Sequence, residues 1–257
     1  MTYSSTEKLY KHIKLLVMDN VLPRQGLAIV SFVLSVFLLV AAPHTATSVM
    51  ADEVIEETDF TTTLKLAREG DPEAMYVVAL RLMEEEDESY QQDAFGWALN
   101  AARAGHPHAA ELTGRFYRLG MGVDTNYVKS RKWLFRALYR GAVGANFELA
   151  LLFSDEDNPA FNEEQAAEHM ENAIKKNEPR ACLVAAEAKL ASGLSVRKSL
   201  KELTCAANGG IVSAMLYIAD YYMEKRSPNA QFLAMQWLKK AADAGDESAM
   251  QRLADMQ

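Results

Sequence analysis

The sequence predicts an all-α fold built from stacked helix-turn-helix repeats. A glycine followed four residues later by an alanine recurs along the chain, and successive alanines are 35, 36, 36, 33 and 35 residues apart. Small and large residues also recur at helical spacing in both halves of each repeat. One helix pair of this size cannot bury its apolar face alone, so we expect about five repeats to stack on a continuous core.

The first 51 residues have the features of an export signal. Basic residues precede residues 26–42, which carry no charge, and Val49 and Ala51 occupy the positions that a signal peptidase reads. A signal peptide cleaved after Ala51 and an uncleaved inner-membrane anchor both fit this pattern. In either case we expect residues 52–257 to form a repeat domain outside the cytoplasmic membrane, in the periplasm or cell envelope.

The first helix of each repeat follows the recurring glycine and alanine. Another small residue comes five positions after the alanine, and a large apolar residue usually comes three positions later, although Lys189 breaks this pattern. A glycine at the recurring position can adopt the left-handed conformation that closes the preceding helix. The recurring pairs are Gly70/Ala74, Gly105/Ala109, Gly141/Ala145, Asn177/Ala181, Gly210/Ala214 and Gly245/Ala249.

The second helix of each repeat has its own landmarks. A small residue is followed after three positions by a tryptophan or its replacement, and after four more by an alanine, which places all three on one helical face. The sets are Ala94/Trp97/Ala101, Ser130/Trp133/Ala137, Ala166/His169/Ala173, Ser199/Glu202/Ala206 and Ala234/Trp237/Ala241.

Half-repeats are expected at both ends of the array. The stretch "FTTTLKLAREG" precedes the first full repeat, and "DESAMQRLADMQ" follows the last one. Each can supply one helix that covers an otherwise exposed terminal core. No proline-rich or low-complexity linker interrupts the repeats, so we expect one repeat domain after the leader.

The stretch from Gly105 to Gly141 resembles the Sel-one-like repeat family, a relative of the tetratricopeptide repeat. The resemblance implies a right-handed α-solenoid whose first helices line a concave surface and whose members usually act as adaptors. It is weaker in the third and fourth repeats, where His169 and Glu202 replace tryptophan. The residues that carry it are Ala109, Gly114, Tyr117, Gly120, Gly122, Val123, Ser130, Trp133 and Ala137.

The same resemblance implies a partner-binding groove on the first helices. That surface would mix aromatic anchors, carboxylates and arginines, a composition that suits an extended peptide or a helix with basic and apolar residues. The alternative is that about half of these positions are merely solvated. The predicted groove residues are Tyr76, Leu80, Glu84, Glu111, Arg115, Arg118, Phe147, Leu151, Asp155, Leu183, Glu187, Leu216, Asp220 and Glu224.

The charge distribution restricts the partner. The chain has a formal net charge of -8, and residues 52–257 alone carry 23 basic against 33 acidic residues, or -10. A body this acidic repels nucleic acid and anionic lipid surfaces. We therefore expect a protein or peptide partner, with a basic one the easier to accommodate, and membrane contact only through an uncleaved N-terminal segment.

Motifs that could carry chemistry are better explained by the repeat. Gly120-Met121-Gly122 lacks the strand and third glycine of a phosphate-binding loop. His106 and His108 are expected to be surface histidines rather than metal ligands, because other repeats have acids at the corresponding helix start. The acidic runs lack the glycine and the terminal glutamate of a calcium loop. We expect no catalytic residue, metal or cofactor.

Cys182 and Cys205 are the two cysteines. They are equidistant from the turn at residues 193–194, so a helical hairpin would place them at the same height. The position of Cys205 is polar in the other repeats, however, which indicates a solvent-facing side chain. We therefore expect two free thiols.

The sequence thus favours an exported, non-catalytic scaffold for protein interactions in the bacterial cell envelope. Two alternatives remain open at this stage. One is a hydrolase of cell-wall or β-lactam substrates, and the other is an assembly factor for exopolysaccharide or flagellar-motor machinery.

Overall fold

A computed structural model describes residues 60–85, 88–225 and 227–256. The apolar run at residues 26–42 and the predicted domain boundary after residue 51 lie outside this part of the chain. The described residues contain twelve α-helices and no strand, which confirms the all-α prediction. None of these helices has the length and apolar character needed to cross a membrane.

The helices form two compact bundles that meet in sequence between Lys176 and Asn177. The N-terminal bundle holds α4 (Phe60–Glu69), α5 (Pro72–Met83), α6 (Glu88–Ala104), α7 (Pro107–Leu119), α8 (Tyr127–Tyr139), α9 (Ala145–Ser154) and α10 (Glu163–Lys175). The C-terminal bundle holds α11 (Pro179–Ala191), α12 (Val196–Asn208), α13 (Val212–Met223), α14 (Pro228–Asp243) and α15 (Glu247–Ala254).

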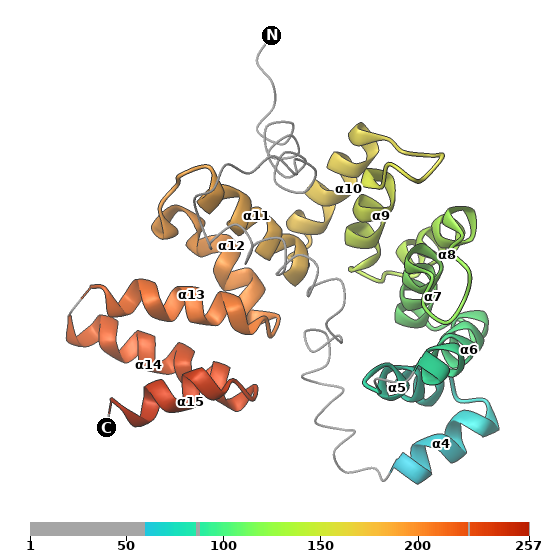
Figure 1. Ribbon diagram of the computed structural model, residues 1–257, viewed down its shortest axis with the longest axis horizontal. Helices are drawn as coiled ribbons and strands as arrows, with labels where there is room; N and C mark the ends of the chain where they lie inside the picture. The colour runs from blue at the N-terminus through green and yellow to red at the C-terminus, as the bar shows by residue number, and fades with distance from the viewer. Residues whose placement is uncertain (1–59, 86–87, 226, 257) are drawn as a thin grey trace. The chain divides into compact units, whose positions relative to one another are not determined.

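Within each bundle, every helix packs against the next one along the chain (Figure 1). The predicted pairs are α5 with α6, α7 with α8, and α9 with α10 in the N-terminal bundle, then α11 with α12 and α13 with α14 in the C-terminal one. The terminal helices α4 and α15 pack on α5 and α14, respectively. The prediction of five helix pairs with a half-repeat at each end is confirmed.

The recurring small residues lie where helices pack most closely. The recurring alanines are buried in all six places, and so are the small residues and alanines of the second helices. In the second repeat, a Cβ added to Gly114 would lie 2.6 Å from the Leu134 side chain. The Ser130 hydroxyl donates a hydrogen bond to the Gly114 carbonyl oxygen at 2.7 Å. The contact with Leu134 requires a small residue at position 114, and the hydrogen bond joins α7 to α8 at the same place.

Each repeat closes at a residue in the left-handed conformation. The recurring glycines have φ between 87° and 110°, and Asn177, which replaces glycine in the fourth repeat, has φ 56°. Among the described residues, Asn177 is the only non-glycine with positive φ. Asparagine tolerates this conformation better than most side chains do. The recurring glycine position therefore requires a left-handed backbone conformation, as the sequence predicted.

Side chains at the same place satisfy the first amides of several first helices. Asp71, Glu178 and Asp246 each accept a hydrogen bond from the backbone N–H three residues later, all at 2.7 Å. His106 does the same through Nδ1, which accepts from the Ala109 N–H at 2.9 Å. These are N-caps, which satisfy donors that the helix itself leaves unpaired.

The prediction that His106 is a surface histidine is wrong. Its side chain is only 9% exposed, and its ring stacks on Tyr76 with the ring centroids 4.7 Å apart. Nδ1 accepts the capping hydrogen bond, so the proton of the neutral ring lies on Nε2, which is 2.9 Å from the Glu73 carboxylate. His106 thus joins α5 to the start of α7.

Candidate functional site

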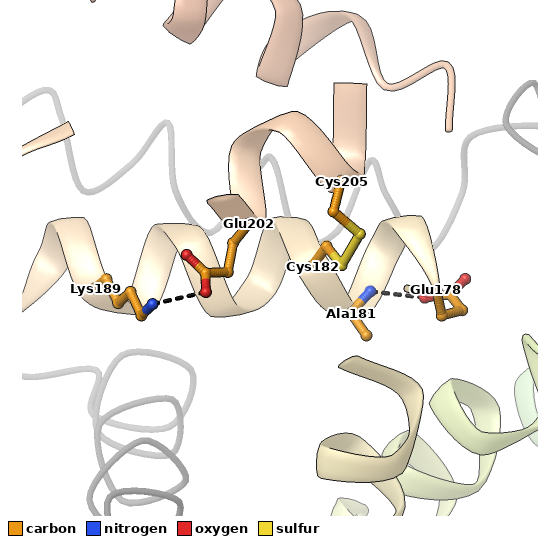
Figure 2. The surroundings of a disulfide bond; sticks show 6 residues. All are labelled: Glu178, Ala181, Cys182, Lys189, Glu202 and Cys205. Carbon is orange, nitrogen blue, oxygen red and sulfur yellow. Dashed lines mark hydrogen bonds and ion pairs between the residues drawn. A yellow bond between two sulfur atoms is a disulfide. The ribbon is translucent and has the colours of Figure 1, made fainter. Parts of the chain in front are cut away.

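The fourth repeat holds a disulfide between Cys182 on α11 and Cys205 on α12 (Figure 2). The expectation of two free thiols is therefore wrong, although the expected equal height of the two cysteines is correct. Their Cα atoms are 6.0 Å apart, within the range that a disulfide spans. Cys205 differs from the polar residues at its position in other repeats because its small, apolar side chain packs against the buried cluster between the helices.

An ion pair lies in the same repeat. Lys189 Nζ is 2.8 Å from Glu202 Oε1, and Figure 2 shows the two side chains meeting between α11 and α12. Both residues departed from the repeat pattern in the sequence. The corresponding residues of the second repeat, Tyr117 and Trp133, belong to one apolar cluster. The two departures are thus a matched replacement of an apolar contact by a charged one.

The third repeat replaces the same contact in another way. His169, which stands in the tryptophan position, stacks on Phe153 with the ring centroids 5.7 Å apart and the planes 8° from parallel. Burial lowers the pKa of His169, and the nearby Glu168 charge only partly offsets this shift. The neutral ring is therefore favoured, and it keeps an aromatic contact between α9 and α10.

The predicted groove residues differ widely in exposure. Six of them expose less than a tenth of their surface and only three are exposed, so a smaller face is available for binding than the sequence suggested. The buried set is Tyr76, Glu111, Arg115, Phe147, Leu183 and Glu187. Leu80, Arg118, Leu151, Asp155 and Leu216 are partly exposed, and Glu84, Asp220 and Glu224 are exposed. Their role in partner binding stays a prediction.

Arg118 is engaged within the protein rather than offered to a partner. Its guanidinium Nη2 is 2.9 Å from Glu148 Oε2, and the two side chains are only 8% and 2% exposed. This pair joins the first helices α7 and α9 of successive repeats. Glu148 is the third residue after its recurring alanine, and Arg118 is the ninth after the preceding one. The charge of Arg118 is therefore already neutralised.

A related contact joins α13 to α15. Arg252, again the third residue after its recurring alanine, pairs with Asp220, the sixth residue after the alanine of α13. In both contacts the third residue after a recurring alanine pairs with a residue of the preceding first helix, which is the ninth residue after its alanine in one case and the sixth in the other. Sequence reasoning missed these ion pairs because the two members of each pair lie on different repeats.

Glu187 occupies the position on α11 that Asp220 occupies on α13. Its side chain faces no described cation, and no described hydrogen-bond donor reaches its buried Oε2. Only 8% of the residue's surface is exposed. Burial raises the pKa of this carboxyl to about 7. Glu187 is thus a carboxylate held in an environment that disfavours its charge.

Tyr217 on α13 is the neighbour that corresponds to Arg252. It is the third residue after Ala214, and 41% of its surface is exposed. Burial of the hydroxyl and the charge of Glu187 both raise the pKa of Tyr217. Tyr217 therefore places a phenol at the position where Arg252 places a guanidinium in the next repeat. The predicted groove set included Glu187 but omitted Tyr217.

The histidines at the start of α7 do not form a metal site with their neighbours. His108 Nδ1 is 3.9 Å from Glu111 Oε2, and interaction with this carboxylate raises the pKa of His108. Among the described residues, no group of three or more His, Cys, Asp or Glu side chains could hold a metal ion.

An exposed apolar stripe on α8 was not predicted. Val128, Phe135 and Tyr139 are 70%, 43% and 94% exposed. A comparison between repeats could have found it, because Tyr139 stands where other repeats carry charged or amide residues. Those residues are Arg103, Lys175, Asn208 and Asp243.

Comparison with solved structures finds Sel1 repeat proteins. No protein-family model matches the chain, and no curated protein matches it. A Sel1 repeat protein from Oxalobacter formigenes has a TM-score of 0.52 and 22% sequence identity, over 77% of this chain and 59% of that one. The chain therefore spans less than two thirds of the length of that protein.

Two further structures have a TM-score of 0.45. A protective antigen present in uropathogenic Escherichia coli strains, which displays an SLR fold, is 16% identical over 97% of this chain and 64% of its own. A candidate Sel1 repeat protein from Klebsiella pneumoniae subsp. pneumoniae is 19% identical over 77% of this chain and 99% of its own. The likeness to the Oxalobacter protein, together with the helix pairs, shows that this chain has an all-α solenoid fold of the Sel1-repeat type.

Proposed function

We propose that this protein is an exported, non-catalytic scaffold that binds a protein partner in the bacterial cell envelope. The observation that carries the binding proposal is the surface of α13. Leu216 and Tyr217 present apolar surface there, beside the exposed carboxylate of Glu224 and the Asp220 carboxylate, which is paired with Arg252. Apolar residues flanked by carboxylates suit a peptide segment with apolar and basic side chains.

The disulfide supports the export part of the proposal. Disulfides form and persist in the periplasm and other oxidising compartments and are rare in the cytosol. The chain has two cysteines, and both are in the Cys182–Cys205 bond. Together with the apolar leader, this bond favours a location outside the cytoplasmic membrane.

Thiol trapping in intact cells tests the export proposal. Cells are quenched with acid, and the denatured protein is alkylated with a mass-tagged maleimide before and after reduction. We expect no tag before reduction and two tags afterwards, with the protein in the envelope fraction. Two tagged thiols without reduction, in a protein that fractionates with the cytosol, would contradict export.

Affinity capture tests the binding proposal. The envelope-localised protein is captured with its partners, and a Tyr217→Ser variant is compared with a Phe232→Ser variant. Phe232 is a matched control because it is also an exposed aromatic residue, 60% exposed, on the second helix α14. We expect loss of the partner only with Tyr217→Ser. Equal capture by both variants would show that α13 is not the binding surface.

The non-catalytic part of the proposal has a separate test. Purified protein is incubated with peptidoglycan fragments and with a chromogenic β-lactam. We expect no turnover above that of buffer. Turnover that is lost on changing Glu187 or Asp220 would instead establish a hydrolase.

A further inference from the structure

We infer that Glu187 and Tyr217 form a receptor site for one arginine or lysine side chain of the partner. The partner's cation would form an ion pair with Glu187. In the next repeat, the protein's own Arg252 forms the corresponding ion pair with Asp220. This inference rests on the proposed function, because it names the chemistry by which the scaffold recognises its partner.

The first support is the equivalence of two positions. Asp220 is the sixth residue after the recurring alanine of α13, and Arg252 of α15 neutralises it. Glu187 is the sixth residue after the recurring alanine of α11, but the residue that corresponds to Arg252 is Tyr217. The fold therefore brings an acid to the same kind of inter-repeat contact and supplies no cation there.

The second support is the state of the Glu187 carboxylate. The residue is 8% exposed, and its Oε2 receives no hydrogen bond from the described residues. An uncompensated buried carboxylate is strongly unfavourable unless it is paired or protonated. A cationic ligand would remove this cost, so the site gains more from a cation than an exposed carboxylate would.

The third support is that the cations on α11 and just after α13 are engaged with other residues. On α11 itself, Lys189 is bound to Glu202 and Arg180 to Glu178. The helix α13 carries no lysine or arginine. Lys225, the first lysine after α13, lies over the Tyr221 ring, with its Nζ 4.6 Å from the ring centroid. Among the described residues, none of these cations is placed to neutralise Glu187.

Tyr217 gives the site a second interaction with a cation. Tyr217 is 41% exposed and lies close enough to Glu187 for the carboxylate charge to raise its pKa. The face of a tyrosine ring attracts guanidinium and ammonium groups. Arginine can stack on a ring and donate to a carboxylate at the same time, whereas lysine offers a point charge. We therefore expect arginine to bind more tightly than lysine.

A peptide titration tests the inference. The full chain is titrated calorimetrically with a capped peptide of alternating leucine and arginine, and with the same peptide carrying neutral citrulline in place of arginine. We expect the arginine peptide to bind at least about tenfold more tightly to the wild type, and Glu187→Gln to abolish this preference. Asp243→Asn is the matched control, because it removes one exposed carboxylate of α14, outside the proposed binding surface, and should change affinity by less than about twofold.

A second variant keeps the test informative if Glu187→Gln perturbs the fold. Tyr217→Arg copies the Asp220–Arg252 arrangement into the preceding repeat. It should raise the thermal unfolding midpoint and remove arginine-peptide binding, because the internal guanidinium would occupy the carboxylate. Unchanged peptide binding by this variant would overturn the inference.

The remaining outcomes also decide the matter. Failure of the wild type to bind the arginine peptide, or equal binding of the arginine and citrulline peptides, overturns the inference. So does a concentration-dependent dimer that Glu187→Gln abolishes, because a second copy would then fill the site. If Glu187→Gln still captures the envelope partner as well as the wild type does, the cation site is wrong and the proposed scaffold function stands.

Discussion

At the scale of single residues, the protein's most unusual group is a carboxylate without a cation. Glu187 resembles neither a solvated acid nor a structural ion pair, since it is almost fully buried and its Oε2 is unbonded within the described residues. Arg118, which the sequence marked as the distinctive groove cation, is by contrast neutralised by Glu148. Of these two predicted groove residues, only the acid therefore has a charge that no described residue neutralises.

Glu187 should make stability depend on pH. Its pKa is about 7 in the folded protein against 4.5 for an ordinary glutamate. Between pH 4.5 and 7 the folded state therefore holds more protons than the unfolded state, so stability falls as pH rises through this window. We expect Glu187→Gln to be more stable than the wild type at pH 8, by roughly 3 kcal/mol, and to lose most of this advantage at pH 4.5.

Urea unfolding across this pH range measures the effect. Glu224→Gln serves as the control, because that carboxylate is exposed. A wild-type and a Glu187→Gln curve that run parallel from pH 4.5 to 8 would show that the carboxyl titrates normally.

His106 provides a second residue-scale prediction. Its Nδ1 accepts the hydrogen bond that caps α7. His106→Ala should lower the free energy of unfolding by about 1 kcal/mol, and His106→Asp should retain most of it, because aspartate is the cap at the same place in the first repeat. Urea unfolding of the two variants at pH 8 checks this. Equal loss in both would mean that stacking on Tyr76, rather than capping, is what His106 contributes.

At the scale of helices, the contact between α11 and α12 differs in kind from its counterparts. The other second helices present Trp97, Trp133, His169 or Trp237 to the preceding helix, whereas this pair is joined by an ion pair and a disulfide. Charged pairs that replace apolar packing seldom add stability, because desolvation offsets the attraction. We therefore expect the disulfide to supply stability that the aromatic contact supplies in the other repeats.

Removing the disulfide should therefore destabilise the C-terminal bundle. Cross-linking residues 23 positions apart restricts the unfolded chain, which is worth about 3 kcal/mol. We expect a Cys182→Ala, Cys205→Ala double variant to have a free energy of unfolding lower by that amount, and therefore to unfold at a lower urea concentration. Hydrogen exchange should show the loss first in α11 and α12. Unchanged protection of these helices would mean that packing alone holds the pair.

Restoring the repeat pattern should compensate. Lys189→Ala alone leaves the Glu202 carboxylate, which is 13% exposed, without its cation, and should cost about 2 kcal/mol or more. A Lys189→Tyr, Glu202→Trp double variant recreates the contact of the second repeat and should be at least as stable as the wild type. If the double variant were less stable than Lys189→Ala, the two departures would not be a matched replacement. Thermal unfolding by circular dichroism distinguishes the outcomes.

At the scale of the whole molecule, the repeat and its helix boundaries were predictable from the sequence. Close packing and left-handed closures demand small residues and glycine at fixed spacing, and that demand leaves a periodic signal at Ala109, Gly114 and Gly141. Asn177 replaces the recurring glycine without breaking the repeat spacing, because asparagine tolerates the same left-handed backbone conformation.

The pairing between repeats was not predictable in the same way. Whether a groove position is buried or already paired depends on the neighbouring repeat, as Arg118 with Glu148 and Asp220 with Arg252 demonstrate. The disulfide was missed for a related reason, since the equivalents of Cys205 point to solvent while this small side chain turns toward α11. Periodicity predicts the face of its own helix on which a residue lies. It does not predict which residues of a neighbouring helix contact that residue.

The central claim is that the α13 surface of an exported scaffold binds a protein partner in the envelope. Site-specific photo-cross-linking in living cells tests it most directly, with p-benzoylphenylalanine placed at Tyr217 on α13 or at Phe232 on α14, both exposed aromatic positions. The account predicts a discrete cross-linked envelope protein from position 217 and none from position 232. No adduct from position 217, or the same adduct from both positions, would contradict it.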